Sequence, residues 1–311
     1  MSWILIAIGA YFLVALEIIL DKFMLSSKRV SHPAVYAFYS GVLSLTTLLI
    51  FAPFGFHLIS LGSALLSLAA GLIFTYGILC LFFAINKSEA SQAIPVVGAM
   101  IPLTTYFLSL IFLDENLQRH QLLGVFVLIV GGLLISFDLP LKINKKKFFA
   151  GFYYSLGAGI LLAIAFTSFK HFYEQDNFLN VFIWTRMGLF IGALTLLATP
   201  AWRRIIRGSF GGLKKGQAEQ KSNLKTSLLF VANKALGGTG SILTNWAISL
   251  GSVTIVNALV STEYAFILLL GIIFSVRFPR IFQEKRDVKS VLEKIVAILL
   301  ITTGVVLISL K

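Results

Sequence analysis

Four ionisable side chains stand inside long apolar stretches of this sequence: Glu17, Arg186, Lys234 and Glu263. A charge at the centre of a hydrocarbon layer costs about 2.5–3.5 kcal/mol on insertion scales, so such residues mark function by default. A carboxylate in apolar surroundings can take up and release protons or bind a cation. These four residues are therefore the first candidates for substrate binding or ion coupling.

Each of the four also has a structural alternative. Glu17 is close to Lys22 and to the expected membrane interface, where it can pair with a lysine or with water. Glu263 lies deep in its segment, where an unpaired carboxylate is unfavourable, so Arg186 and Lys234 are its expected partners. Such a pair is either a switchable charge in a cavity or a static contact. Lys234 can alternatively snorkel to the interface, and Arg186 can alternatively position backbone carbonyls.

Three polar residues recur at helical spacing near Glu263, namely Asn257, Ser261 and Tyr264. Their i, i+4, i+7 positions put them on one face, which we expect to point inward. Trp246 is a further candidate on the preceding segment. The alternative role for all of them is hydrogen bonding between helices, worth about 0.6 kcal/mol per bond on average.

Two prolines indicate a second wall of the same cavity. Pro95 and Pro102 are seven residues apart, so they share a helix face, and each removes a backbone hydrogen bond. Freed carbonyls at membrane depth are tolerated where they face protein or a water-lined cavity. Gln92 precedes them on the same segment and is included among the candidate substrate contacts.

Composition decides the class of protein that must position these residues. Of the 311 residues, 58% are hydrophobic and 13% are charged, and the mean hydropathy is +0.91. A soluble domain carries about 25% charged residues, so the chain is expected to be a polytopic membrane protein. We expect no metal site, because the histidines are dispersed, and no ATP drive, because no phosphate-binding loop occurs. The net charge of +13 sits mostly in loops, which indicates membrane orientation and no nucleic-acid partner. We also expect no enzymatic activity and no cofactor.

Apolar segments of about 20 residues can cross a bilayer as helices. The sequence predicts ten of them, at 3–21, 34–53, 62–84, 90–113, 119–137, 148–169, 179–199, 227–249, 252–276 and 290–310.

The plan of Ala84–Phe137 recurs in Ala247–Leu310, which divides the chain into repeats of five helices, 1–147 and 148–311. An odd number of helices per repeat turns the second copy upside down. The predicted fold is therefore all-α, with ten transmembrane helices as two inverted repeats. Substrate sites in such folds lie near the midplane between the repeats.

Basic residues predict the orientation. Of the 26 Lys and Arg residues, 21 fall in loops on one side and three on the other. The positive-inside rule places the basic loops in the cytoplasm and both termini outside a plasma (inner) membrane. The segment 201–226 is expected to be a basic cytoplasmic loop, either mobile or lying on anionic headgroups.

The repeat resembles the EamA-type members of the drug/metabolite transporter superfamily. The resemblance rests on these residues: Ala90-Ser91-Gln92-Ala93, Pro95, Pro102, Leu113-Asp114-Glu115, Gln121, Gly124 and Gly131. Asp114 stands where family members usually have glycine, and the matching turn of the second half, Val276-Arg277-Phe278, lacks the glutamate. The resemblance implies a ten-helix transporter of small metabolites or drugs. It also implies cytoplasmic termini, which the charge count contradicts.

Glu17 also resembles the single membrane glutamate in the first helix of small multidrug resistance proteins, which belong to the same superfamily. We therefore expect a secondary transporter, an exporter of a small organic solute, acting by alternating access as a monomer or homodimer. Proton or cation coupling and plain facilitated export are both compatible with the residues. A lipid or lipid-linked-sugar translocase on the same fold and a non-transporting scaffold or sensor are the alternatives.

Overall fold

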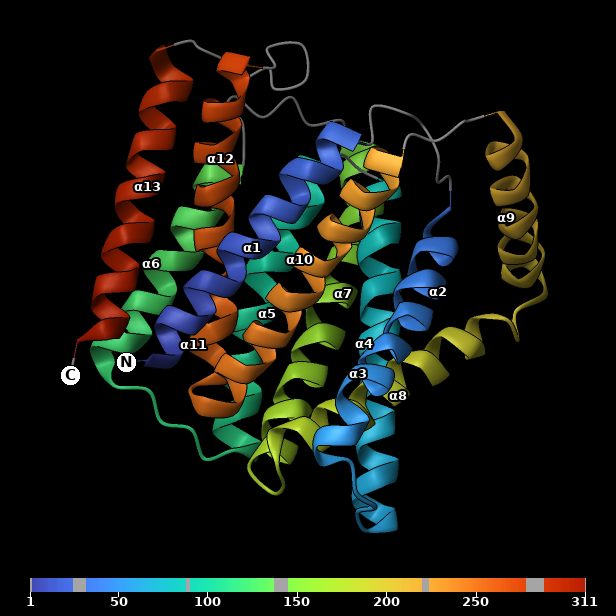
Figure 1. The fold of residues 1–311 in the computed structure, drawn as a ribbon. Helices are drawn as coiled ribbons and strands as arrows, with labels where there is room; N and C mark the ends of the chain where they lie inside the picture. The colour runs from blue at the N-terminus through green and yellow to red at the C-terminus, as the bar shows by residue number, and fades with distance from the viewer. Residues whose placement is uncertain are drawn as a thin grey trace.

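The computed structural model describes residues 2–24, 32–87, 90–136, 145–219, 224–277 and 288–310. Every regular element in these ranges is a helix (Figure 1). The helices are α1 (Ser2–Met24), α2 (Pro33–Leu43), α3 (Leu45–Gly55), α4 (Leu61–Lys87), α5 (Ala90–Phe112), α6 (Arg119–Ser136), α7 (Lys145–Tyr173), α8 (Phe178–Leu196), α9 (Pro200–Glu219), α10 (Leu224–Leu250), α11 (Val253–Ala258), α12 (Val260–Arg277) and α13 (Val288–Ser309).

A helix or a pair of helices occupies each of the ten apolar ranges expected from the sequence. The second range is divided into α2 and α3 at Ser44, and the ninth into α11 and α12 at Leu259. The Ser44 hydroxyl lies within hydrogen-bonding distance of the carbonyls of Gly41 (2.6 Å) and Arg186 (2.9 Å), which share its single proton, and the second contact ties this break to α8. Both breaks therefore lie inside segments long enough to cross a membrane.

Nine segments of the described chain are long and apolar enough to cross a membrane. They are Ser2–Leu20, Pro33–Gly55, Leu61–Lys87, Ala93–Phe112, Arg119–Ser136, Gly151–Tyr173, Phe178–Leu196, Val253–Phe274 and Val291–Ser309. This identifies a polytopic membrane protein. The eighth predicted range corresponds to α10, which has 27 residues but is not among the nine. The tenth crossing and the inverted repeat therefore stay predictions.

The segment 201–226 differs from its expected form as a loop, because α9 occupies it through Glu219. The reason lies in its apolar side chains, which are spaced so that they pack on one side. Ile206 is fully buried in a cluster with residues of α2, α4 and α8, and Trp202 packs against Phe83. Arg203 and Arg207 remain exposed. The amphipathic pattern was present in the sequence, but the high charge concealed it.

The bundle is built from a few extensive helix contacts (Figure 1). In it α1 packs against α10 and α12, α4 against α7 and α8, and α6 against α13. Small residues permit these close approaches: a β-carbon on Gly188 of α8 would run into the backbone of Leu68 in α4. The N-terminus and the C-terminus lie at the same end of the bundle.

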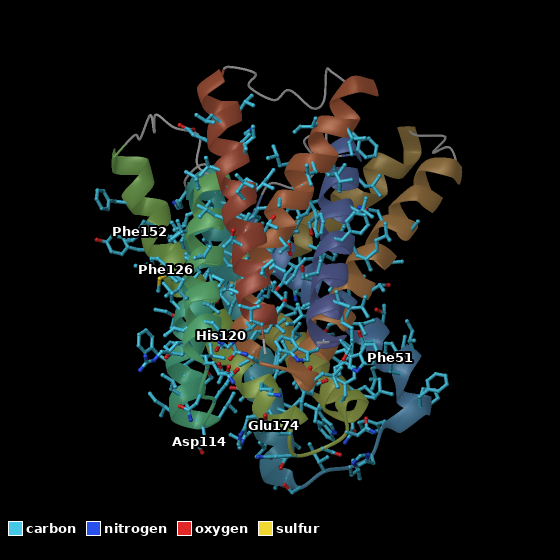
Figure 2. All side chains as sticks on the ribbon, turned by 90° about the vertical axis from the view of Figure 1, so that its left-hand side faces the viewer. Phe51, Asp114, His120, Phe126, Phe152 and Glu174 are labelled. Atoms are coloured by element: carbon cyan, nitrogen blue, oxygen red, sulfur yellow. The ribbon has the colours of Figure 1, made fainter. Side chains whose placement is uncertain are left out.

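Large apolar side chains cover the sides of the bundle. Phe126 is 63% exposed, and Figure 2 shows it and Phe152 pointing outward from the flank, whereas Asp114 and Glu174 lie at one end. Exposed aromatic residues on the flank and charges at the end are the distribution expected of a protein surrounded by lipid. The polar residues inside the bundle are therefore shielded from the lipid by α6, α7 and their neighbours.

Candidate functional site

Two of the candidate carboxylates, Glu17 of α1 and Glu263 of α12, come together inside the bundle. The helices that carry them pack directly against each other. Glu263 is only 9% exposed, and the two carboxylates are close enough for their charges to interact. Like charges at such a separation repel each other, and a cation bound between them would relieve that repulsion.

The third wall of this site is a glycine of α10. The Glu17 carboxylate lies against Gly237, where a β-carbon would overlap both of its oxygens. At the neighbouring Gly238 a β-carbon would meet nothing within 4 Å. The missing side chain at Gly237 therefore makes the room that the Glu17 carboxylate occupies.

Two tyrosines lie within electrostatic reach of Glu263, Tyr11 from α1 and Tyr264 from α12. The Tyr11 hydroxyl donates to the carbonyl of Val256 in α11 (2.9 Å). This bond connects α1 to the short helix α11 that leads into α12, about two turns before Glu263. It fixes the positions of the helices that carry the two carboxylates.

Arg186 does not pair with Glu263. It donates to the Ser241 hydroxyl of α10 (3.3 Å), and its guanidinium lies 4.3 Å from the centre of the Phe182 ring. Its Nε is buried and has no hydrogen-bond partner in the described part of the chain. The sequence argument assumed that opposite charges would find each other, whereas α8 turns this side chain toward the polar face of α10.

That polar face of α10 continues beyond Ser241. The amide of Asn245 donates to the Ser241 carbonyl (2.9 Å), and its oxygen accepts from the Tyr173 hydroxyl of α7 (3.1 Å). Asn245 and Tyr173 are both buried. Polar contacts thus run from α8 through α10 to α7, which explains why α10 is less apolar than the nine candidate spans.

The stripe of Asn257, Ser261 and Tyr264 points inward and is used for helix packing. Asn257 donates to the Thr105 hydroxyl of α5 (3.1 Å), and Ser261 donates to the Leu128 carbonyl of α6 (2.7 Å). The Tyr264 hydroxyl occupies the space where a β-carbon of Gly98 would lie. Asn257 and Ser261 therefore make interhelical contacts, and only Tyr264 also reaches the carboxylates.

The remaining candidates lie apart from the carboxylates or cannot be placed. Pro95 and Pro102 are buried, and α5 continues as one helix through both. Trp246 is 42% exposed and is not part of the interior. The side chains of Gln92 and Lys234 lie outside the described residues.

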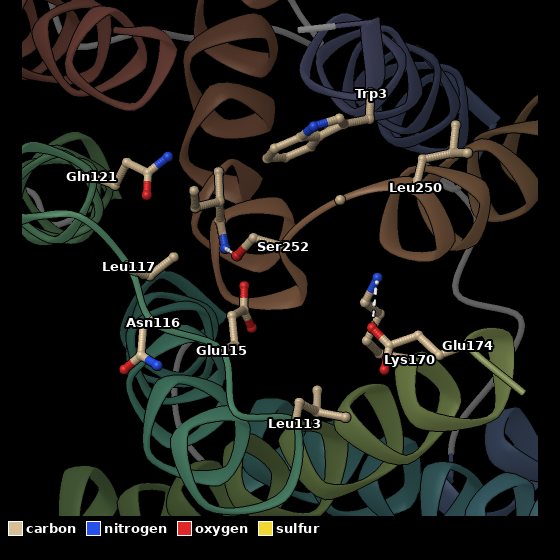
Figure 3. A pocket seen from close by; sticks show the side chains of 12 residues that line it. Trp3, Leu113, Glu115, Asn116, Leu117, Gln121, Lys170, Glu174, Leu250 and Ser252 are labelled. Atoms are coloured by element: carbon tan, nitrogen blue, oxygen red, sulfur yellow. Dashed lines mark hydrogen bonds and ion pairs between the residues drawn. The ribbon is translucent and has the colours of Figure 1, made fainter. Parts of the chain in front are cut away.

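A separate cavity of about 380 Å³ opens at the end of the bundle that carries the termini (Figure 3). It is formed by the links α5–α6 and α10–α11 together with the end of α7, and none of its lining residues is a sequence candidate. Its lining includes Trp3, Glu115, Lys170, Glu174 and Ser252. We call it the vestibule.

Sequence reasoning missed Gly237, Tyr11 and Ser241. The pair Gly237-Gly238 was visible, but without the lysine of a phosphate-binding loop it gave no chemical signal. Tyr11 is at i−6 from Glu17, a spacing that places the two on different parts of α1. Their common role depends on α12, which only the fold brings beside α1.

Comparisons with known proteins agree with this architecture. A solved crystal structure superposes with a TM-score of 0.66 over 99% of this chain and 98% of the other, at 15% sequence identity. The fold is therefore one that an experimental structure also has. An uncharacterised protein of Methanocaldococcus jannaschii is 31% identical over 70 residues, which is 22% of this chain and 50% of that protein. The match spans only half the length of that relative.

The fold and its apolar helices define a polytopic membrane protein. Residues 1–137 match the EamA-like transporter family. The resemblance drawn from the sequence motifs is thereby confirmed for residues 1–137, and EamA-like transporters belong to the drug/metabolite transporter superfamily.

Proposed function

We propose that this chain is a secondary transporter that moves a small organic solute across the plasma membrane by alternating access, with export as the expected direction. The single observation that carries the proposal is the meeting of Glu17 and Glu263 inside the bundle. A membrane scaffold would gain nothing from two neighbouring carboxylates at membrane depth, one of them buried. A transporter can use them to hold a proton and a cationic group of the solute in turn.

Helix breaks next to the carboxylates support this reading. Substrate and ion sites of secondary transporters are often formed by interrupted helices near the midplane. Here α11 ends and α12 begins at Leu259, four residues before Glu263. Ser241 and Asn245 of α10, the helix that carries Gly237, provide hydrogen-bonding groups that contact Arg186 and Tyr173.

The packing also supports ten crossings in two inverted repeats. Exchanging the halves would map α1 onto α7 and α4 onto α10, and the pairs α1–α10 and α7–α4 are both in close contact. The equivalent helices α6 and α13 touch reciprocally, since a β-carbon on Gly124 or Gly304 would lie 3.0 Å from the other's carbonyl oxygen. With the basic loops in the cytoplasm, the termini and the vestibule would lie outside.

The test begins with a solute identified by ligand stabilisation of the purified protein, screened across amino acids, nucleosides, sugars and cationic drugs. Flux of that solute under a pH gradient is then measured in proteoliposomes. Glu17→Gln and Glu263→Gln are each expected to reduce it by about 10-fold or more, the range in which positioned acid–base groups contribute. Asp114→Asn, an exposed carboxylate outside the bundle interior, is the control and should keep wild-type flux.

Lipid movement is measured in the same vesicles. Translocation of a labelled lipid with no solute flux would replace the proposal with a lipid translocase. Undiminished pH-driven flux in both glutamine variants would remove the carboxylates from the mechanism.

A further inference from the structure

The vestibule contains a charged group whose bonding is incomplete. Both carboxylate oxygens of Glu115 are buried; the Ser109 and Ser252 hydroxyls are near enough to act on the carboxylate, but no hydrogen bond of good geometry reaches either oxygen from the residues that the structure describes. A buried acceptor without a well-placed donor is destabilising, and more so when it is charged. The chain retains this cost at the wall of a cavity, which indicates that a donor from outside the chain completes the site.

The local backbone directs Glu115 into this position. Asp114 adopts a left-handed conformation (φ 48°), and the Glu115 N–H then donates to the Ser109 carbonyl at the end of α5 (3.1 Å). Figure 3 shows the Glu115 side chain pointing toward Ser252 at the start of α11. The Ser252 hydroxyl accepts from the Ile255 N–H (3.0 Å) and so caps α11, while its own proton acts on the Glu115 carboxylate without completing its hydrogen bonding.

The opposite wall carries charges that compensate each other. Lys170 forms an ion pair with Glu174 (3.2 Å) and donates to the Ser249 carbonyl (3.3 Å). No ion pair joins Lys170 to Glu115, although both are described residues. With Lys170 and Glu174 paired, the ionised Glu115 leaves the vestibule with one uncompensated negative charge.

An aromatic face lies above this charge. The indole of Trp3 rests on Gly251, where a β-carbon would overlap the ring, and it overhangs the cavity in Figure 3. Leu113, Leu117 and Leu250 supply apolar lining. An indole face attracts a nearby cation through the ring quadrupole, and 380 Å³ is within the usual range for a small-molecule pocket.

We propose that the vestibule binds a small organic monocation, with its ammonium group at the Glu115 carboxylate and its carbon body against Trp3. The ammonium supplies the missing hydrogen-bond donors and balances the single negative charge. The site shares no residue with the Glu17–Glu263 pair, so it is a second site and does not depend on the transport proposal.

Isothermal titration of the purified protein with n-butylammonium chloride at pH 8 tests this assignment, with n-butanol and sodium butyrate as neutral and anionic probes of the same carbon body. We expect binding of butylammonium alone, weakened by about 10-fold or more in Glu115→Gln, because a charge-assisted hydrogen bond is lost. Asp114→Asn removes a neighbouring exposed charge and should bind like the wild type. Trp3→Ala should weaken binding severalfold without any change in charge. This variant tests the assignment if Glu115→Gln does not fold.

The central carboxylates are separated by a further variant. The double variant Glu17→Gln/Glu263→Gln is expected to keep butylammonium binding. Loss of binding in that variant with retention in Glu115→Gln would place the cation at the central site and overturn the assignment. Equal affinities of Glu115→Gln and wild type would also overturn it, since a proton or water alone would then satisfy the carboxylate.

Discussion

Replacing Gly237 by alanine is the most informative single change in this chain, because its neighbour provides a matched control. Gly237 and Gly238 are consecutive in α10, and alanine at either position gains about 0.5–1 kcal/mol of helix stability relative to glycine. Only at Gly237 would the new β-carbon meet the Glu17 carboxylate; at Gly238 it meets nothing within 4 Å. Differences between the two variants therefore report on the Glu17 contact alone.

The magnitude follows from the kind of atom that is displaced. Overpacking of an interior costs about 1–3 kcal/mol, and the low end applies here because the clashing atoms terminate a flexible side chain. We expect Gly237→Ala to be about 1 kcal/mol or more less stable than Gly238→Ala. Solute flux should fall in Gly237→Ala, since the Glu17 carboxylate is moved away from Glu263, and should be retained in Gly238→Ala.

Thermal unfolding in detergent and flux in proteoliposomes measure the two effects. Equal stability of the variants together with wild-type flux in Gly237→Ala would refute the placement of the Glu17 carboxylate on α10.

Three further predictions concern the packing and the vestibule. Gly188→Ala should lower the free energy of unfolding by about 1–3 kcal/mol, because its β-carbon meets backbone atoms of α4, whereas Gly62→Ala, with open space around it, should not. Tyr11→Phe should lower the free energy of unfolding by about 1 kcal/mol, because the hydrogen bond to the Val256 carbonyl is lost. Chemical unfolding of the two proteins measures this difference. Burial raises the pKa of Glu115 above its ordinary value of 4.5, although the Ser252 and Ser109 hydroxyls and Lys170 act to lower it. The folded protein then holds this proton to higher pH than the unfolded chain does. The free energy of unfolding should therefore fall as the pH rises from about 4.5 through the raised pKa, and this fall should be absent in Glu115→Gln.

The helices were largely predictable because lipid imposes a simple rule on them. A run of apolar residues long enough to span the bilayer must satisfy its own backbone, and it does so as a helix. The rule located α4 and α13 within a few residues. It says little about α9, whose amphipathic pattern packs Ile206 against α2, α4 and α8. Hydropathy also does not decide whether α10 crosses the membrane. Its polar residues Asn245 and Ser241 lower the hydropathy because they face other protein groups.

The candidate site was predictable in part, since depth in the membrane singled out Glu17 and Glu263 without any knowledge of the fold. Their proximity could not be deduced, because it depends on α1 packing against α12 across 246 positions of sequence. Charge alone gave the wrong partner for Arg186, which follows the direction that α8 imposes. Glu115 was noticed only as part of a motif, because its burial arises from the packing of two links that are distant in sequence.

The central claim is that Glu17 and Glu263 act as one site, and a double-mutant cycle on solute flux tests it most directly. Flux under a pH gradient is measured for the wild type, Glu17→Gln, Glu263→Gln and the double variant. Residues that act as a unit give strongly non-additive effects, so the account predicts a double variant no slower than the slower single variant. A double variant whose loss equals the product of the two single losses would show two independent residues and contradict the account.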